Sequence, residues 1–125
     1  MEDAYMAGLM DADGWIGIKR TKNLSGNTSY SPSAVLTNSD LKILYAVQKV
    51  FGGNLNEKTR KENWKQSFNL NFRTYELRNL LEHTQLYLVG KKEQASIVLE
   101  VLDKVIGKEI AFYRMKKLNR RGVDV

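Results

Sequence analysis

The sequence predicts an α+β domain in which a four-stranded antiparallel sheet carries helices on one of its faces. Two pairs of segments alternate between apolar and polar residues, and each pair is joined by a short polar stretch, as in a β-hairpin. Segments with helical spacing precede, separate and follow these pairs, which gives the order helix, hairpin, helix, hairpin, helices. With 125 residues, a single proline and no long Gly/Ser stretch, we expect residues 1–125 to form one domain.

The first helix and the first hairpin are predicted from local signals. Residues 3–10 begin with acidic side chains, which the helix dipole stabilises at its N-terminus, and residues 11–14 are expected to end the helix. Residues 15–24 then alternate, residues 25–27 form a turn, and residues 28–36 return as the second strand.

The second helix has a clear start and stop. Asn38 and Ser39 are both good N-caps, and apolar residues then recur at helical spacing up to Phe51. Gly52 and Gly53 stop the helix. Strands at 54–60 and 65–73 form the second hairpin around residues 61–64, and helices are predicted at 75–82, 92–106 and 109–118, the last one leading into a basic tail.

Alternation assigns to the open face of the sheet a set of side chains that are nearly all hydrogen-bonding and never acidic. They are Lys19, Thr21, Asn23, Ser29, Ser31, Ser33, Asn56, Lys58, Arg60, Lys65, Ser67, Asn69, Asn71 and Arg73. A solvated face is one interpretation; the other is a polar platform that contacts phosphates and reads base edges, since a β-ribbon fits the major groove of DNA. The excess of 20 Lys and Arg over 14 Asp and Glu also favours a polyanionic partner, although basic ribosomal and membrane-surface proteins share it.

Composition excludes several classes of protein. Without cysteine there is no disulfide scaffold, thiolate metal site or cysteine nucleophile, and a reducing compartment fits. His83, the single histidine, makes a zinc site improbable and is expected on a loop. The apolar runs are much shorter than the roughly 18 residues of a membrane span, and the first residues are acidic, unlike a secretory signal. An intracellular location is expected, with cytoplasm and organelle not distinguished.

Residues 6–14, which read MAGLMDADG, resemble the nine-residue signature of the LAGLIDADG homing endonucleases. Seven of the nine letters are identical, and Met6 and Met10 replace apolar residues of similar volume. The segments 37–53 and 87–95 resemble further landmarks of that family. The resemblance implies a site-specific endonuclease of intron homing, which cuts both strands of a long pseudo-palindromic DNA site by metal-dependent phosphodiester hydrolysis.

The same resemblance suggests roles for individual residues. Asp13 matches the metal-binding acid of the family, and the backbone carbonyl of Ala12 is a further ligand; oxygen ligands of this kind suit Mg²⁺. Lys91 matches a basic residue near the metals, where a cation offsets charge on phosphate. Thr37 and Asn38 are alternatives for a polar residue that positions water. Outside the motif context, Asp13 would be taken for a turn residue and Lys91 for a solvated lysine.

The motif also predicts a homodimer. Ala7 and Gly8 have almost no side chain, so that a second helix can approach this face closely, although packing inside one subunit would explain them too. The sequence carries one copy of the motif, and a second copy would come from another chain through an isologous interface.

Asp11 is interpreted as a structural hydrogen-bonding residue rather than a ligand.

Strand length gives the size of the DNA site. A strand of about nine residues spans about 30 Å, or roughly nine base pairs, so that two subunits would cover about 20 base pairs. The alternative function is a cleavage-inactive RNA maturase or DNA-binding regulator of the same fold. The presence of Asp13 and Lys91 favours the enzyme, because a protein that only binds needs neither. No membrane or small-molecule partner is expected.

Overall fold

The computed structural model describes residues 1–58 and 66–124, and it confirms the α+β class and the order of elements. The elements are α1 (Asp3–Asp13), β1 (Gly14–Lys22), β2 (Thr28–Asn38), α2 (Leu41–Phe51), β3 (Asn54–Lys58), β4 (Ser67–Phe72), α3 (Thr74–Thr84), α4 (Lys92–Leu102) and α5 (Lys108–Asp124). Within these ranges no helix combines the length and the hydropathy needed to cross a lipid bilayer.

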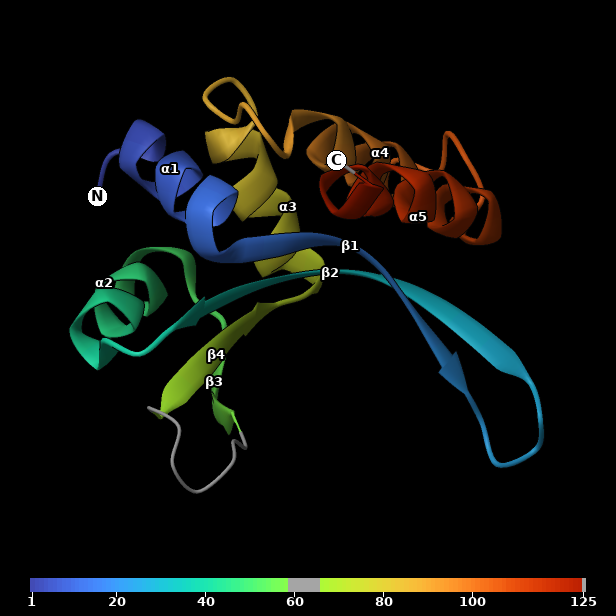
Figure 1. Ribbon diagram of the computed structural model, residues 1–125, viewed down its shortest axis with the longest axis horizontal. Coiled ribbons are helices and arrows are strands. Elements are labelled where there is room, and N and C mark those ends of the chain that lie inside the picture. Colours follow the sequence, from blue (N-terminus) through green and yellow to red (C-terminus); the bar gives the residue numbers. More distant parts are fainter. Residues whose placement is uncertain (59–65, 125) are drawn as a thin grey trace.

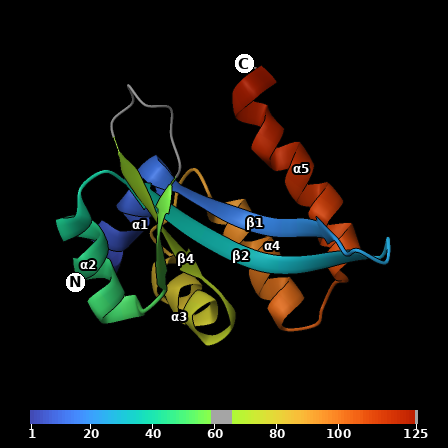
Figure 2. The ribbon, with the colours of Figure 1, turned by 90° about the horizontal axis from the view of Figure 1, so that it is seen from below.

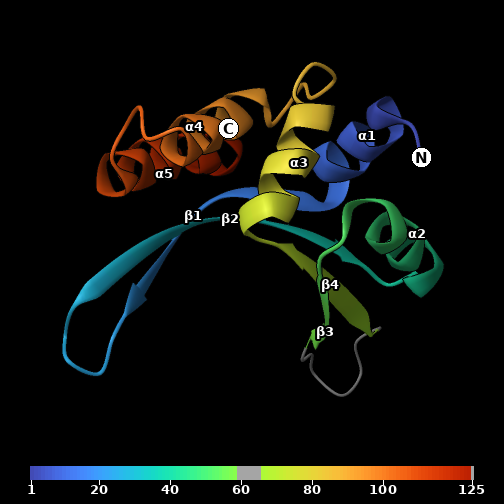
Figure 3. The ribbon, with the colours of Figure 1, turned by 180° about the vertical axis from the view of Figure 1, so that it is seen from behind.

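The four strands form one antiparallel sheet in the order β1-β2-β4-β3. β1 pairs with β2 over its whole length, but β4 pairs with β2 only from Ala34 to Asn38. The outer half of β1 and β2 is therefore a two-stranded ribbon. Figure 1 shows α1, α3, α4 and α5 above the sheet, α2 beside its left-hand end, and the strands curving downward at both ends; the reverse view in Figure 3 shows the same arch. The side of the sheet without helices is thus concave.

The hydrophobic core lies between the sheet and the helices. Ile16, Ala34, Leu36, Leu70 and Phe72 come from alternate positions of three strands, and each is at most 1% exposed. They pack in one cluster with apolar side chains of all five helices. Each large apolar side chain buried in this way contributes about 1.5–3 kcal/mol. The burial confirms the predicted alternation and directs the odd-numbered residues of β1, β2 and β4 to the concave face.

Helix α1 is longer than predicted. The predicted span 3–10 is too short by three residues, because the helix continues through Asp13; it ends within residues 11–14 as expected, where the amide of Gly14 donates to the carbonyl of Met10. Asp11 is also held from outside the helix, by amides of the segment before α4. Asp11 and Asp13 are therefore both helical residues, and they lie on different sides of the last turn of α1.

The start of α2 also differs from the prediction. Asp40 is the N-cap, since its carboxylate accepts a hydrogen bond of 2.9 Å from the amide of Lys42. Asn38 instead ends β2, where it pairs with Phe68 of β4, so the prediction of Asn38 or Ser39 as the cap was wrong. At the other end of the chain α5 runs on to Asp124, through the segment expected to be a basic tail. The predicted turn at 61–64 lies outside the described residues.

Helix α5 packs against the β1–β2 ribbon. The guanidinium of Arg20 lies 4.9 Å from the ring centre of Phe112, and the ring of Tyr30 lies 5.3 Å from that of Phe112. Viewed from below, α5 leaves the ribbon beside β1 and its C-terminal end projects away from the sheet (Figure 2). The outer part of the ribbon is therefore supported from the helical side, while its concave side stays uncovered.

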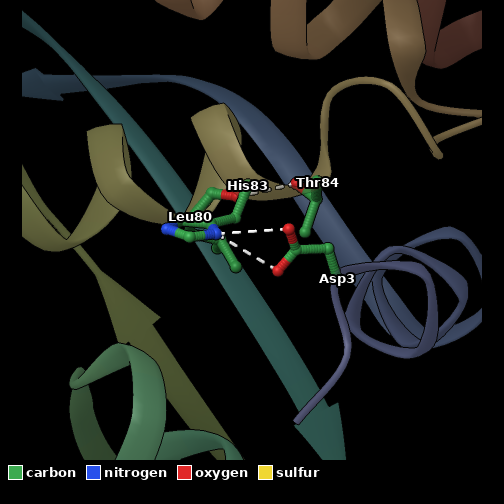
Figure 4. Close-up of polar contacts among 4 residues, drawn as sticks. All are labelled: Asp3, Leu80, His83 and Thr84. Atoms are coloured by element: carbon green, nitrogen blue, oxygen red, sulfur yellow. Dashed lines mark hydrogen bonds and ion pairs between the residues drawn. The ribbon is translucent and has the colours of Figure 1, made fainter.

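Polar contacts join the start of α1 to the end of α3 (Figure 4). Nδ1 of His83 lies 3.2 Å from Oδ1 of Asp3, and the buried hydroxyl of Thr84 donates to the carbonyl of Leu80 at 2.8 Å. His83 belongs to the last turn of α3, which corrects its predicted place on a loop. The contact with Asp3 helps to fix the direction in which α1 crosses the domain.

Candidate active site and open sheet face

Asp13 lies at the exposed C-terminal end of α1, next to the end of β2. The amide Nδ2 of Asn38 donates to Oδ2 of Asp13 over 3.5 Å. Oδ1 of Asn38 accepts a hydrogen bond of 2.8 Å from the amide of Asp40, which directs the other end of the side chain toward Asp13. In the described part of the chain this long contact is the one hydrogen bond that reaches the Asp13 carboxylate, so most of its lone pairs remain available.

Asp11 and Lys91 connect the same end of α1 to the start of α4. Oδ2 of Asp11 accepts from the amide of Val89 at 2.8 Å, and Oδ1 accepts from the amide of Lys91 at 3.0 Å. The ammonium of Lys91 in turn donates to the backbone carbonyl of Asp11 at 2.7 Å. The structural role expected for Asp11 is confirmed. The bond to the Asp11 carbonyl also holds the Lys91 ammonium near Asp13, which follows Asp11 by two residues in α1.

The end of α1 suits a divalent cation, although one chain supplies few ligands. The last carbonyls of a helix point outward and carry partial negative charge, which adds to the charge of the Asp13 carboxylate. All these donors are oxygens, as Mg²⁺ prefers. The residues that the structure describes contain no group of three His, Cys, Asp or Glu side chains able to hold a metal. The donors fit Mg²⁺ if waters, phosphate oxygens or a second subunit complete the shell.

Thr37 and Asn38, the alternatives for a water-positioning residue, point in different directions. The hydroxyl of Thr37 donates to Oδ1 of Asn69 on the neighbouring strand, over 2.7 Å. Only Asn38 of the two contacts Asp13 among the described hydrogen bonds.

The open face keeps most of the predicted polar residues accessible. Exposed members in the strands are Lys19, Thr21, Ser29, Ser31 and Asn56, and half-buried members are Asn69 and Asn71. Asn23 and Arg73 are also exposed but lie outside the strands, since Asn23 follows β1 in the turn and Arg73 is the N-cap of α3. Ser33 and Ser67 are only 2% and 5% exposed, so they are not surface groups in this structure. Lys58 is placed in β3 opposite Ser67, by its backbone alone. Arg60 and Lys65 lie outside the described residues.

Trp15 and Gly17 form a close contact on this face that the sequence did not indicate. A Cβ added to Gly17 would lie 2.6 Å from the Trp15 ring, so the absent side chain makes room for the indole. Gly17 pairs with Ser33, whose buried hydroxyl has no hydrogen-bond partner among the described residues. The centre of the concave face is therefore less polar than the strand residues around it. Strand alternation alone does not predict this contact.

Gln94 and Asn119 are further polar residues near Lys91 that the sequence analysis missed. Nε2 of Gln94 donates to Oδ1 of Asn119 at 3.2 Å, and both residues line a hollow beside Lys91 and Leu118. α4 and α5 bring these residues together from positions 25 apart, so no local motif could have indicated them.

The two small residues of the α1 motif face opposite ways. Ala7 is fully buried inside the chain, whereas Gly8 is exposed and has no atom within 4 Å of the place where its Cβ would be. Of this pair, only Gly8 can receive a second helix. Beside it, exposed Tyr5 lines an apolar hollow with Met1, Glu2, Ala46, Lys49 and Val50.

The fold and the site together define a domain with a polar concave sheet and a carboxylate at its edge, an arrangement suited to a nucleic acid and a cation. A family model described as "LAGLIDADG endonuclease" matches residues 6–100. Because this match covers most of the chain, the protein belongs to the LAGLIDADG endonuclease family. A search of curated proteins found no match.

Solved structures of homing endonucleases share the fold. I-CvuI, crystallised with its target in the presence of calcium, is 27% identical, with a TM-score of 0.66 over 82% of this chain and 66% of its own. I-TnaI is 16% identical, with a TM-score of 0.69 over 96% and 86%. The archaeal intron-encoded enzyme I-Vdi141I, in complex with DNA, is 20% identical, with a TM-score of 0.66 over 93% and 76%. The chain thus spans just under two thirds of I-CvuI.

Proposed function

We propose that the protein is a site-specific DNA endonuclease of intron homing, which acts as a homodimer and hydrolyses phosphodiesters with the help of Mg²⁺. The observation that carries this proposal is the exposed Asp13 carboxylate, held at the end of a family-signature helix and beside a concave polar face whose described residues include no acid. The family's enzymes are metal-dependent DNA endonucleases.

Four residues of the chain would have different roles in the hydrolysis of the phosphodiester. Asp13 and the carbonyl of Ala12 would hold the ion, which supplies Lewis-acid charge that lowers the pKa of a bound water and offsets charge on the phosphate. The amide of Asn38 orients the Asp13 carboxylate. The ammonium of Lys91 adds a fixed positive charge beside the end of α1, where it stabilises negative charge that develops on the phosphate.

The surface of α1 supports the proposed dimer. Gly8 is open to close helix approach, and the apolar hollow beside Tyr5 extends the same region onto α2. In an isologous dimer each chain would place its own Asp13 near the two-fold axis, so that two carboxylates serve the two strands of DNA. The arrangement would also add ligands to those that the described residues of one chain provide.

The sheet supplies the DNA-binding surface. Among the described strand residues, its concave face carries Lys, Asn, Ser and Thr side chains, which can bind phosphates and base edges, and a two-stranded ribbon fits the major groove. β1, with nine residues, spans about 30 Å or roughly nine base pairs. Two subunits would thus read about 20 base pairs with approximate two-fold symmetry.

The test is incubation of the protein with a randomised duplex library and Mg²⁺, followed by sequencing of the ends produced. Asp13→Asn should abolish cutting and keep duplex binding largely intact, because it removes a metal ligand and leaves the concave face unchanged. Asp103→Asn is the matched control, since Asp103 is an exposed acid that pairs with Arg78 and is not one of the candidate site residues. The control should cut as the unsubstituted protein does.

Two results would contradict the proposal. Equal loss of binding and cutting in Asp13→Asn would refute the metal-ligand role. Specific binding by the unsubstituted protein without any cutting would indicate the alternative function, a DNA-binding regulator; selective binding of RNA instead would indicate a maturase.

A further inference from the structure

We infer that a groove between the outer edge of β1 and helix α5 binds the sugar–phosphate backbone of the DNA duplex, with Arg20 and Lys116 as the phosphate contacts. The inference rests on the proposed function and adds a contact surface beside the concave face of the sheet. The groove consists of two hollows that share Arg20: the inner one extends to Asn119 of α5, and the outer one extends to Lys22 at the end of β1.

One side of α5 forms the first wall of this groove. Phe112, Lys116 and Asn119 recur at helical spacing and line the inner hollow, and Met115 beside them is buried in the core. Lys116 and Asn119 are both exposed. Within the described part of the chain no hydrogen bond or ion pair uses the Lys116 ammonium, so its charge is available to a ligand.

The edge of β1 forms the second wall. β1 stands at the end of the strand order, so its outer edge pairs with no other strand of the sheet. In the view from below, α5 lies on the β1 side of the ribbon (Figure 2). Arg20 is exposed on this strand, and its guanidinium lies 4.9 Å from the ring centre of Phe112. Because the face of the ring attracts a cation, this contact holds the charge of Arg20 between the strand and the helix.

The charge of the groove favours an anionic ligand. Arg20, Lys22 and Lys116 line the two hollows, and no acid does. Glu109, on the first turn of α5, acts on the outer hollow from nearby: burial and the charge of Glu109 together raise the pKa of the Tyr30 hydroxyl there. The inner hollow, with Lys116, is therefore the stronger site for an anion.

The position of the groove matches the border of a major groove that holds the β1–β2 ribbon. A major groove is about 12 Å wide and about 8.5 Å deep, whereas the two strands of a ribbon are about 4.8 Å apart. A ribbon that enters such a groove has a chain of phosphates along each of its edges. Trp15 and Ile18, from opposite faces of β1, both line the inner hollow, so the hollow opens at the strand edge itself. The phosphates along β1 would therefore pass in front of Arg20 and Lys116.

The experiment measures binding of the full chain to two duplexes of equal length without divalent metal. One duplex carries a sequence enriched from a randomised library, and the other carries a scrambled sequence. Lys116→Ala should weaken binding to both by about eightfold for each subunit at about 0.1 M salt, because each phosphate contact releases counterions. The slope of log Kd against log salt should fall by about 1.8, or about 0.9 for each subunit. Base preferences should stay the same, because phosphate contacts carry no sequence information.

Lys117 provides the matched control. It is the next residue of α5 and is also exposed, but it does not line the groove. Lys117→Ala should change the affinity by no more than about twofold, since salt screens a surface charge that contacts no phosphate. Lys116→Arg keeps the positive charge and should bind DNA as the unsubstituted protein does.

Arg20→Gln tests the opposite wall and keeps the inference testable if Lys116→Ala folds poorly. It should lower the salt slope by the same amount, and thermal unfolding of the variant shows whether the loss of the Phe112 contact has weakened the fold instead. Ethylation of single phosphates gives a second readout. At least one phosphate whose ethylation blocks binding of the unsubstituted protein should cease to interfere in Lys116→Ala.

The outcomes distinguish this inference from the proposed function. If the unsubstituted protein binds neither duplex, the proposed function fails and this inference with it. If it binds, but folded Lys116→Ala and Arg20→Gln match Lys117→Ala in affinity and salt slope, DNA binding by the concave face stands and the groove contacts no phosphate. A change of base preference in Lys116→Ala would also overturn the inference, because Lys116 would then read bases.

Discussion

The link between Asp11 and the segment before α4 should make a large contribution to stability, which Asp11→Ala would remove. The two carboxylate oxygens of Asp11 accept from two different backbone amides, those of Val89 and Lys91. Both bonds join residues about 80 positions apart in the chain, so they hold the end of α1 against the start of α4. The same substitution also loosens the anchor of the Lys91 side chain.

The magnitude follows from these two bonds. A hydrogen bond to a charged group contributes about 1.5–3 kcal/mol, and the lower figure applies here because the site is partly exposed. Two bonds then give about 3 kcal/mol, and the better helix propensity of alanine returns about 0.5 kcal/mol. For a chain of this size the net loss lowers the melting temperature by about 10 °C. Asp11→Asn should lose at least half as much, because the nitrogen of the new amide would face one of the two N–H donors.

Thermal unfolding followed by circular dichroism, at one fixed protein concentration, measures the effect. Asp103→Asn serves as the control and should melt within about 2 °C of the unsubstituted protein, because an exposed ion pair contributes little. An Asp11→Ala protein that melts as the control does would refute the reasoning, and the two bonds would then have no net value in water.

Three further predictions concern other surfaces. Gly8→Leu should give a folded monomer in sedimentation at micromolar concentration, since Gly8 is exposed and a Cβ added there meets no other part of the chain; a stable dimer would exclude this face as the interface. Lys19→Ala should weaken DNA binding and reduce the slope of log Kd against log salt by about 1.8, or 0.9 for each subunit, and an unchanged slope would mean that Lys19 contacts no phosphate. Gly17→Ala should cost about 1–3 kcal/mol of unfolding free energy through its clash with the Trp15 ring, and much less in a Trp15→Ala background; equal losses in both backgrounds would place the strain elsewhere.

Local patterns predicted the elements well where one signal dominates. The alternation of Phe68, Leu70 and Phe72 placed β4 and its buried face correctly, because a strand with one buried face tolerates no shift of register. The glycines after Phe51 stop α2 as predicted, and Gly52 and Gly53 both have positive φ, a conformation that favours glycine. The boundaries of the helices were harder to predict. Several residues near Asn38 can cap a helix, and the pairing of β2 with β4 decided which one caps α2.

The candidate site, too, was predictable only in part from local patterns. The family resemblance predicted Asp13 and Lys91 as site residues, and these two roles remain predictions; the structural role predicted for Asp11 agrees with its two backbone hydrogen bonds. The geometry of the site was not predictable, because Lys91 reaches Asp11 across 80 residues of chain, and Asn38 reaches Asp13 from the end of β2, 25 residues away. For the same reason the burial of Ala7, Ser33 and Ser67 could not be foreseen.

The amino-acid sequence by itself determined the class of fold, the periodicity that separates core from surface, and the chemical groups available for catalysis, because these depend on neighbours a few positions away. Tertiary structure alone decided which of those groups meet. Contacts such as Thr37 with Asn69, or Lys91 with Asp11, depend on the pairing of strands and on helix packing, and the free energy that fixes them is spread over the whole core. Which polar groups lie within hydrogen-bonding distance of one another was therefore settled only once the sheet had formed.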